Sequence, residues 1–281
     1  MSATETTETT DKSGAGTAPG PSRETSEAWP ERAPKEHERK VGVLGAGVMG
    51  GGIAQVCAIA GFDVIVYDID AAALTAGHEH ATTGRYGLES AVERGKLTRA
   101  EADAATARLT FSEDFAAAAT TDLVIEAVPE RLDLKIRVFR DLDAAAPEHT
   151  ILCSNTSGFP IQAIGAATNR PDRVVGWHWA SPAPVMKLAE IIRTRATSDA
   201  TIETVRDAAR RCGKNPVVIN DTAMAWGFVA NRVYFAMVAE AQKVVNEGIA
   251  TAEEVDQLMT DCFRWPAGPF GMVKGATSGW S

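Results

Sequence analysis

A histidine and a glutamate interrupt the mostly apolar stretch GWHWASPAPVMKLAEII. They are His178 and Glu190, which lie 190 − 178 = 12 residues apart. Burying an ionised group without a partner costs several kcal/mol, so each of the two needs a partner or a task. A strand, a proline-rich turn and a second strand would bring the two side chains together. A lone histidine in such a strand is otherwise most often a hydrogen-bonded core residue.

A glycine-rich segment, GAGVMG, offers a second kind of chemistry. It follows the apolar run KVGVL and precedes a helix-like stretch, and Asp68 ends the next apolar run 68 − 45 = 23 residues after Gly45. This context is the fingerprint of a dinucleotide site, in which glycines let the backbone approach a pyrophosphate. An acid at the position of Asp68 binds ribose hydroxyls and repels a 2′-phosphate, which predicts NAD rather than NADP. The alternative is a structural glycine turn without a nucleotide. The residues predicted to contact the cofactor here are Gly45, Ala46, Gly47, Val48, Met49, Gly50 and Asp68.

A dinucleotide site on the same chain favours a catalytic role for the histidine. Oxidation of an alcohol by NAD requires a base that removes the hydroxyl proton, and imidazole titrates near neutral pH. A carboxylate on the other ring nitrogen would fix the tautomer and stabilise the imidazolium. We therefore expect His178 to be the base and Glu190 to orient it.

The elements that position these residues follow from the alternation of the sequence. Short apolar runs, among them DVIVYD, TDLVIEAV, TILCSN and RVVGWHW, alternate with helical segments as far as NPVVIN. This pattern predicts an α/β fold with a Rossmann-like, mostly parallel sheet covered on both faces. From Ala225 onward the sequence is typical of helices only, and Thr251 is a candidate N-cap. Residues 1–40 contain no Val, Ile, Leu or Phe. The predicted organisation is a disordered tail over 1–38, an NAD-binding domain over 39–220 and a shortened all-α C-terminal domain over 221–281.

Composition excludes several classes of partner. The net charge of −9 and the pI near 5.2 argue against a nucleic acid or an anionic membrane as the main partner, since both are bound through clustered Lys and Arg. The four cysteines are far apart and show neither a disulfide framework nor a metal-binding spacing. No run approaches the roughly 18 apolar residues of a membrane helix. The sequence predicts a cytoplasmic protein without a metal site.

Several motifs occur together in one order along the chain. They are KVGVLGAGVMGGGIAQV, VIEAVPERLDLK, NTSGFPI, GWHWASPAPVMKLAEII, GFVANR and WPAGPF. In this order the sequence resembles the L-3-hydroxyacyl-CoA dehydrogenases, including the bacterial 3-hydroxybutyryl-CoA dehydrogenases. The resemblance covers residue 39 to the C-terminus. It implies a Rossmann-like domain, a helical C-terminal domain that forms a homodimer, and NAD-linked interconversion of 3-hydroxyacyl and 3-ketoacyl thioesters in fatty acid metabolism.

The resemblance also implies roles for individual residues. His178 resembles the catalytic base and Glu190 its partner. Ser157 in NTSG resembles the serine that hydrogen-bonds the substrate oxygen near the nicotinamide, and Asn231 in GFVANR resembles the asparagine that completes the polar site. Ser157 has a simpler alternative as the N-cap of a short helix, and Asn231 as a helix residue bonded to backbone.

Glu130 and Lys135 resemble contacts to the nicotinamide half of NAD. Their simpler alternative is a surface ion pair. Ser181 stands where the family's HFFNP, here HWASP, has an asparagine beside the nicotinamide. Two further departures are NTSG for NTSS and DTAMAWGF for DTPGF. Family members also continue into a KTGxGFY segment whose lysine contacts the cofactor, and this segment has no counterpart here.

Taken together, these features predict an NAD-dependent L-3-hydroxyacyl-CoA dehydrogenase acting on an acyl-CoA. One alternative is a dehydrogenase for a hydroxyacyl group on an acyl carrier protein in polyketide precursor biosynthesis, kept open by the altered HWASP segment. A second alternative, from a different class, is a non-catalytic NAD-binding protein, because a fold does not fix an activity.

Overall fold

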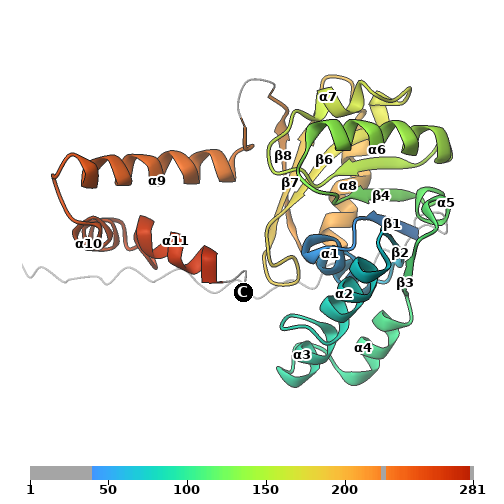
Figure 1. Cartoon of the computed structure of the whole chain (residues 1–281), viewed down its shortest axis with the longest axis horizontal. Coiled ribbons are helices and arrows are strands. Elements are labelled where there is room, and N and C mark those ends of the chain that lie inside the picture. The colour runs from blue at the N-terminus through green and yellow to red at the C-terminus, as the bar shows by residue number, and fades with distance from the viewer. Residues whose placement is uncertain (1–39, 223–225, 279–281) are drawn as a thin grey trace, which may run out of the picture. The chain divides into compact units, whose positions relative to one another are not determined.

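The computed structural model describes residues 40–222 and 226–278, with side chains as far as residue 275. The predicted tail over residues 1–38 lies outside the described residues. Figure 1 shows the elements and their labels.

Eight strands form one sheet in the order β3-β2-β1-β4-β5-β6-β7-β8. Neighbouring strands from β3 to β6 are parallel, β7 is antiparallel to β6, and β8 is parallel to β7. The mostly parallel sheet predicted from the sequence is confirmed, and its exception is the β6–β7 hairpin. The strands are β1 (Lys40–Leu44), β2 (Asp63–Tyr67), β3 (Leu109–Ser112), β4 (Leu123–Glu126), β5 (Ile151–Ser154), β6 (Val174–Trp179), β7 (Leu188–Arg193) and β8 (Asn215–Asn220).

Helices cover both faces of the sheet. One core cluster takes apolar side chains from α1, α2, α3, α4 and α8, and the other takes them from α5, α6 and α7. Neighbouring strand residues enter opposite clusters, as Val124 and Ile125 do. Figure 1 shows α6 and α7 on the opposite side of the sheet from α1 and α2. These helices are α1 (Val48–Ile59), α2 (Ala71–Thr82), α3 (Leu88–Glu93), α4 (Arg99–Thr106), α5 (Phe115–Ala119), α6 (Leu132–Ala145), α7 (Ile161–Gly165) and α8 (Asp199–Arg211), with a 3₁₀ turn at Pro171–Arg173.

The helical region after DVIVYD is less continuous than its sequence indicates. It is divided into α2 and α3, and a third helix, α4, begins after Thr98. The hydroxyl of Thr98 accepts a hydrogen bond from the Glu101 N–H while the Glu101 carboxylate accepts one from the Thr98 N–H, a reciprocal cap. The short strand β3 then follows, which the sequence did not predict.

The segment after the sheet is helical, as predicted. The helices are α9 (Ala230–Asn246), α10 (Ala252–Phe263) and α11 (Pro269–Ser278). Thr251 caps α10 together with Glu254, which confirms the predicted N-cap. Among the described residues, no helix combines the length and the apolar character that crossing a membrane requires.

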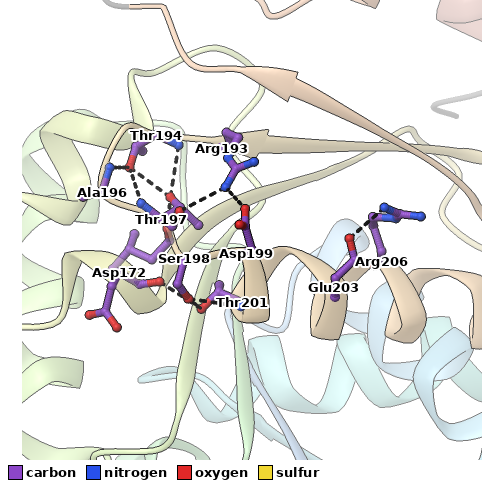
Figure 2. A network of polar contacts seen from close by, with 11 residues as sticks. Asp172, Arg193, Thr194, Ala196, Thr197, Ser198, Asp199, Thr201, Glu203 and Arg206 are labelled. Carbon is purple, nitrogen blue, oxygen red and sulfur yellow. Dashed lines mark hydrogen bonds and ion pairs between the residues drawn. The ribbon is translucent and has the colours of Figure 1, made fainter.

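Side-chain hydroxyls hold the turn between β7 and α8 (Figure 2). The Thr197 hydroxyl donates to the Val174 carbonyl at 2.8 Å and accepts from the Thr194 N–H at 3.0 Å. Arg193 at the end of β7 forms an ion pair with Asp199 at the start of α8. These contacts fix the far end of β7, the strand that carries Glu190.

Candidate active site

The β6–β7 hairpin places His178 directly opposite Glu190. Side chains of opposed residues lie on the same face of an antiparallel pair. The Nδ1 atom of His178 is 2.8 Å from Oε2 of Glu190, and the two residues are only 4 % and 3 % exposed. The structure therefore brings the pair together as the spacing of the sequence predicts. The pairing also satisfies the requirement for a hydrogen-bonded core histidine, so both sequence interpretations agree with this geometry.

The second carboxylate oxygen of Glu190 is also occupied. Oε1 accepts hydrogen bonds from the N–H groups of Val229 and Ala230, at 3.0 and 2.9 Å, where α9 begins. A helix N-terminus favours a negative charge. Burial raises the pKa of the Glu190 carboxyl, but the hydrogen bonds from His178, Ala230 and Val229 outweigh it and hold the pKa below its usual range.

These contacts determine which nitrogen of the histidine is basic. An ionised carboxylate only accepts hydrogen bonds, so Nδ1 of His178 carries the proton that faces Glu190. In the neutral ring, Nε2 is then the atom with a lone pair. The ring centroid lies 5.9 Å from that of Phe228, a buried residue just before α9. The arrangement can take up a proton at Nε2 and stabilise the resulting charge.

The glycine loop has the shape that a dinucleotide requires. Gly45 has φ of 97°, which favours glycine, and a Cβ on Gly50 would lie 1.7 Å from the Gly45 carbonyl oxygen. A Cβ on Gly47 would meet nothing within 4 Å, so the space in front of this residue is open. The helix α1 begins at Val48 and presents its first N–H groups there. The Asp68 carboxylate accepts a hydrogen bond from the Ala46 N–H at 2.8 Å, which ties the end of β2 to the loop.

The helix α1, which follows the glycine loop, lies beside the β6–β7 hairpin, which carries His178. A Cβ on Gly52 of α1 would lie 3.3 Å from both Ala183 Cβ and Pro184 Cδ. These two residues belong to the β6–β7 loop, which also contains the half-buried Ser181. The helix that follows the predicted cofactor loop therefore packs against the hairpin that carries the predicted base.

Lys135 lies deeper than its predicted role indicates. Its side chain is 1 % exposed, and its Nζ atom is 2.7 Å from Glu126 and 3.1 Å from Glu130. The ion pair with Glu130 that the simpler alternative named is present, but Lys135 is buried, so it is not a surface pair. Glu130 in turn accepts hydrogen bonds from the Thr156 hydroxyl at 2.5 Å and from the Ser157 N–H at 2.9 Å. Lys135 thus reaches the segment NTSG through Glu130.

Glu126 was not among the predicted site residues. It is fully buried at the end of β4, and it accepts hydrogen bonds from Lys135, the Ser154 hydroxyl and the Val128 N–H. Burial raises the pKa of the Glu126 carboxyl, although Lys135 and the hydrogen bonds oppose the shift. The signal in the sequence is a glutamate inside the apolar run LVIEAV.

Ser157 and Asn231 lie on two segments that contact one another. A Cβ on Gly158 would lie 2.2 Å from the Gly227 nitrogen and 2.9 Å from the Trp226 ring, so the glycine of NTSG is required by this close approach. Ser157 is not a helix N-cap, since α7 begins at Ile161 after Pro160. The Ser157 hydroxyl and the Asn231 amide have no hydrogen bond to another described residue.

Asn155 is a second residue that the sequence interpretation missed. Its Oδ1 atom accepts a hydrogen bond from the Trp179 N–H at 2.9 Å, which links the end of β5 to the residue after His178. Nothing in NTSG distinguishes this structural asparagine from a ligand-binding one. Within residues 40–222 and 226–278, no group of three or more His, Cys, Asp or Glu side chains could hold a metal ion.

Comparison with known proteins gives matches over most of the chain. Residues 40–222 match the family model "3-hydroxyacyl-CoA dehydrogenase, NAD binding domain", and residues 227–280 match "3-hydroxyacyl-CoA dehydrogenase, C-terminal domain". A probable 3-hydroxybutyryl-CoA dehydrogenase of Bacillus subtilis is 42 % identical over 235 residues, which is 84 % of this chain and 80 % of that protein. The 3-hydroxybutyryl-CoA dehydrogenase of Mycobacterium tuberculosis is 39 % identical over 233 residues, which is 82 % of this chain and 79 % of that protein.

A solved structure agrees with these matches. The crystal structure of (S)-3-hydroxybutyryl-CoA dehydrogenase from Ralstonia eutropha superposes with a TM-score of 0.77 at 39 % identity. The match covers 82 % of this chain and 80 % of that one.

Proposed function

Because this chain belongs to the 3-hydroxyacyl-CoA dehydrogenase family, and so is an NAD-dependent oxidoreductase, we propose that His178 and Glu190 are the catalytic pair of its reaction. The observation that carries this proposal is the buried contact of 2.8 Å between His178 Nδ1 and Glu190 Oε2, which leaves Nε2 as the basic atom. The proposed reaction interconverts 3-hydroxyacyl and 3-ketoacyl thioesters of coenzyme A. The substrate class comes from the names of the relatives, which act on 3-hydroxybutyryl-CoA.

In this proposal, His178 transfers the proton and three other residues support it. In the oxidising direction, His178 Nε2 takes the proton of the substrate hydroxyl, and in the reducing direction it returns that proton. Glu190 stabilises the imidazolium formed in between. The Ser157 hydroxyl and the Asn231 amide hydrogen-bond the substrate oxygen, for which their free hydrogen-bonding groups are suited.

The cofactor site uses the glycine loop. NAD, when bound, supplies the hydride acceptor. The loop from Gly45 to Gly50 holds the pyrophosphate with its N–H groups, and Asp68 holds the adenosine ribose. Glu130 and Ser181 face the nicotinamide end. Lys135 supports this end by holding Glu130, since its own side chain is buried.

Two further proposals concern the whole chain. The helical domain over residues 221–281 forms a homodimer, which is supported by α9, a helix of 17 residues of which Ala241 alone is buried. Apolar side chains of this helix region, including Val233 and Phe235, are 64 % and 49 % exposed. Light scattering on the purified chain tests this, and a monomeric mass contradicts it. The proposed location is the cytoplasm, because the four cysteines are free.

The test of the catalytic pair is oxidation of NADH with acetoacetyl-CoA. We expect turnover by the wild type and a loss of about a thousandfold in kcat for His178→Ala, with NADH binding retained. Equal rates for the two proteins contradict the assignment of the base. A wild type that binds NADH without turning over acetoacetyl-CoA contradicts the proposed substrate.

A separate pair of variants tests the cofactor loop. Gly47→Ala keeps the fold, because its Cβ meets nothing, but it fills the space that the cofactor needs, so we expect NADH affinity to fall about tenfold or more. Gly50→Ala disturbs the loop itself, because its Cβ would meet the Gly45 carbonyl. Fluorescence titration with NADH measures the first effect and thermal unfolding the second. Unchanged NADH affinity in Gly47→Ala places the cofactor elsewhere.

A further inference from the structure

The loop between β6 and β7, residues 180–187, is held by a buried lysine. Lys214, which precedes β8, donates from Nζ to the carbonyls of Ala183 at 2.5 Å and Met186 at 2.7 Å. The residue is 6 % exposed, and Nζ lies 5.1 Å from the centre of the Trp179 ring. In the reverse direction, Lys187 of the loop donates to the Gly213 carbonyl at 3.0 Å. Two lysines thus join the loop to the turn before β8.

The surroundings of Lys214 do not favour a buried charge. The titratable groups that face it are the thiols of Cys57 and Cys212 and the ammonium group of Lys187, and the described residues place no carboxylate against it. Burial lowers the pKa of Lys214 to about 8. A buried cation that contacts two carbonyls and an aromatic ring, without a carboxylate, is less favourable than an apolar side chain in the same space. An apolar side chain at this position could not make the hydrogen bonds by which Lys214 holds the loop.

The loop connects the two halves of the candidate active site. It starts one residue after Trp179, which follows His178 and is itself bonded to Asn155. Through Ala183 and Pro184 it packs against α1, the helix that the glycine loop begins. The loop therefore contacts the helix that follows the cofactor loop, and it continues directly from the strand that carries His178.

We propose that Lys214 is a positioning residue that fixes the β6–β7 loop against α1, so that the cofactor site and His178 keep one relative position. The kinetic part of the test rests on the proposed function. The structural part uses the chain without cofactor or substrate.

Hydrogen exchange of the protein without ligands tests the structural part. The N–H groups of Val185 and Met186 both donate to the Pro182 carbonyl, at 3.0 Å. In Lys214→Met we expect exchange at these two amides to accelerate about tenfold or more, while the strands keep their protection. The control is Lys243→Met, an exposed lysine on α9, which leaves the exchange of the loop unchanged. Unchanged loop exchange in a folded Lys214→Met protein overturns the proposal.

Kinetics and NADH titration test the functional part. We expect Lys214→Met to raise KM and Kd for NADH about tenfold at neutral pH. Constants within twofold of the wild type contradict the proposal.

Failure of the variant to fold and failure of the wild type to turn over acetoacetyl-CoA have different consequences. If Lys214→Met does not fold, Lys214→Gln replaces it, because the shorter amide cannot reach both carbonyls, and wild-type loop exchange and NADH affinity in that variant overturn the proposal. If the wild type does not turn over acetoacetyl-CoA, the proposed substrate fails, whereas the exchange data and the NADH titration still decide the role of Lys214.

Discussion

Two buried carboxylates lie on strands of the same sheet, and their partners differ. Glu126 at the end of β4 pairs with Lys135, and Glu190 on β7 pairs with His178. Both pairs are almost fully buried. An ammonium group only donates hydrogen bonds, whereas a neutral imidazole that donates from one nitrogen keeps a lone pair on the other. Burial and ion pairing are common to both pairs, and the lone pair on His178 Nε2 is the feature that distinguishes the pair proposed as catalytic.

The environments of the two carboxylates shift the pKa in opposite directions. Each accepts three hydrogen bonds from groups of the protein. For Glu126 burial outweighs its partners and raises the pKa, whereas for Glu190 the partners outweigh burial and lower it. Two of the donors to Glu190 are N–H groups at the start of α9, where the helix dipole adds to the hydrogen bonds. Glu190 thus keeps its charge beside the histidine.

Removing Lys135 gives the largest effect that the comparison predicts. Lys135→Met leaves the Glu126 carboxyl buried without its cation, and we expect the free energy of unfolding to fall by about 3–5 kcal/mol. Denaturant unfolding measures this loss. The double variant Glu126→Leu with Lys135→Met removes both charges and recovers most of the stability. A loss below about 1 kcal/mol in the single variant shows that the pair is dispensable for folding.

Glu190→Gln has its main effect on catalysis. The amide no longer stabilises the imidazolium or fixes the ring tautomer, so we expect kcat to fall about a hundredfold. KM for NADH stays near the wild-type value, because the glycine loop is untouched. Steady-state kinetics with acetoacetyl-CoA separates the two constants. A kcat within threefold of the wild type removes Glu190 from the catalytic pair.

The smallest expected effect is on the pH dependence of stability. Protonation of Glu190 lowers the free energy of unfolding, whereas protonation of Glu126 does not. The lowered pKa of Glu190 means that the unfolded chain binds this proton more readily. Its contribution to stability is therefore complete above the unfolded pKa of about 4.3 and is lost as the pH falls through the lower folded pKa. Glu126, with a raised pKa, binds its proton more readily in the folded chain, so its protonation favours the folded state.

Unfolding free energies measured from neutral to acid pH check these signs. Glu190→Gln loses part of the acid sensitivity of the wild type, whereas Glu126→Gln does not. Equal pH slopes for the wild type and Glu190→Gln contradict the lowered pKa.

The sequence predicts one pair better than the other for a physical reason. His178 and Glu190 are joined by a short hairpin, so their spacing of 12 residues and the period of two in a strand determine that they meet. Glu126 and Lys135 meet because β4 ends beside the start of α6, and the direction in which Lys135 points depends on packing around that turn. A motif therefore indicated Lys135 as a cofactor contact, while the structure places it behind Glu130.

Other parts of the fold depend on contacts that no local pattern encodes. The sheet was predictable from its apolar runs, whereas β3 has only the short segment LTFS and gains its place by pairing with β2. Asn155 likewise acquires its partner from a strand that follows later in the chain. The division at residue 220 and the role of each site residue stay predictions.

The two backbone donors of Glu190 come from residues 39 and 40 positions later in the chain. On a ribosome, the strand bearing the glutamate emerges well before the helix that completes its hydrogen bonds. Until that helix is made, burial of the carboxyl would raise its pKa, and a hydrated carboxylate has the lower free energy. The buried pair of His178 and Glu190 therefore acquires its full set of hydrogen bonds only after α9 is made, and a nascent chain released before α9 lacks two of them.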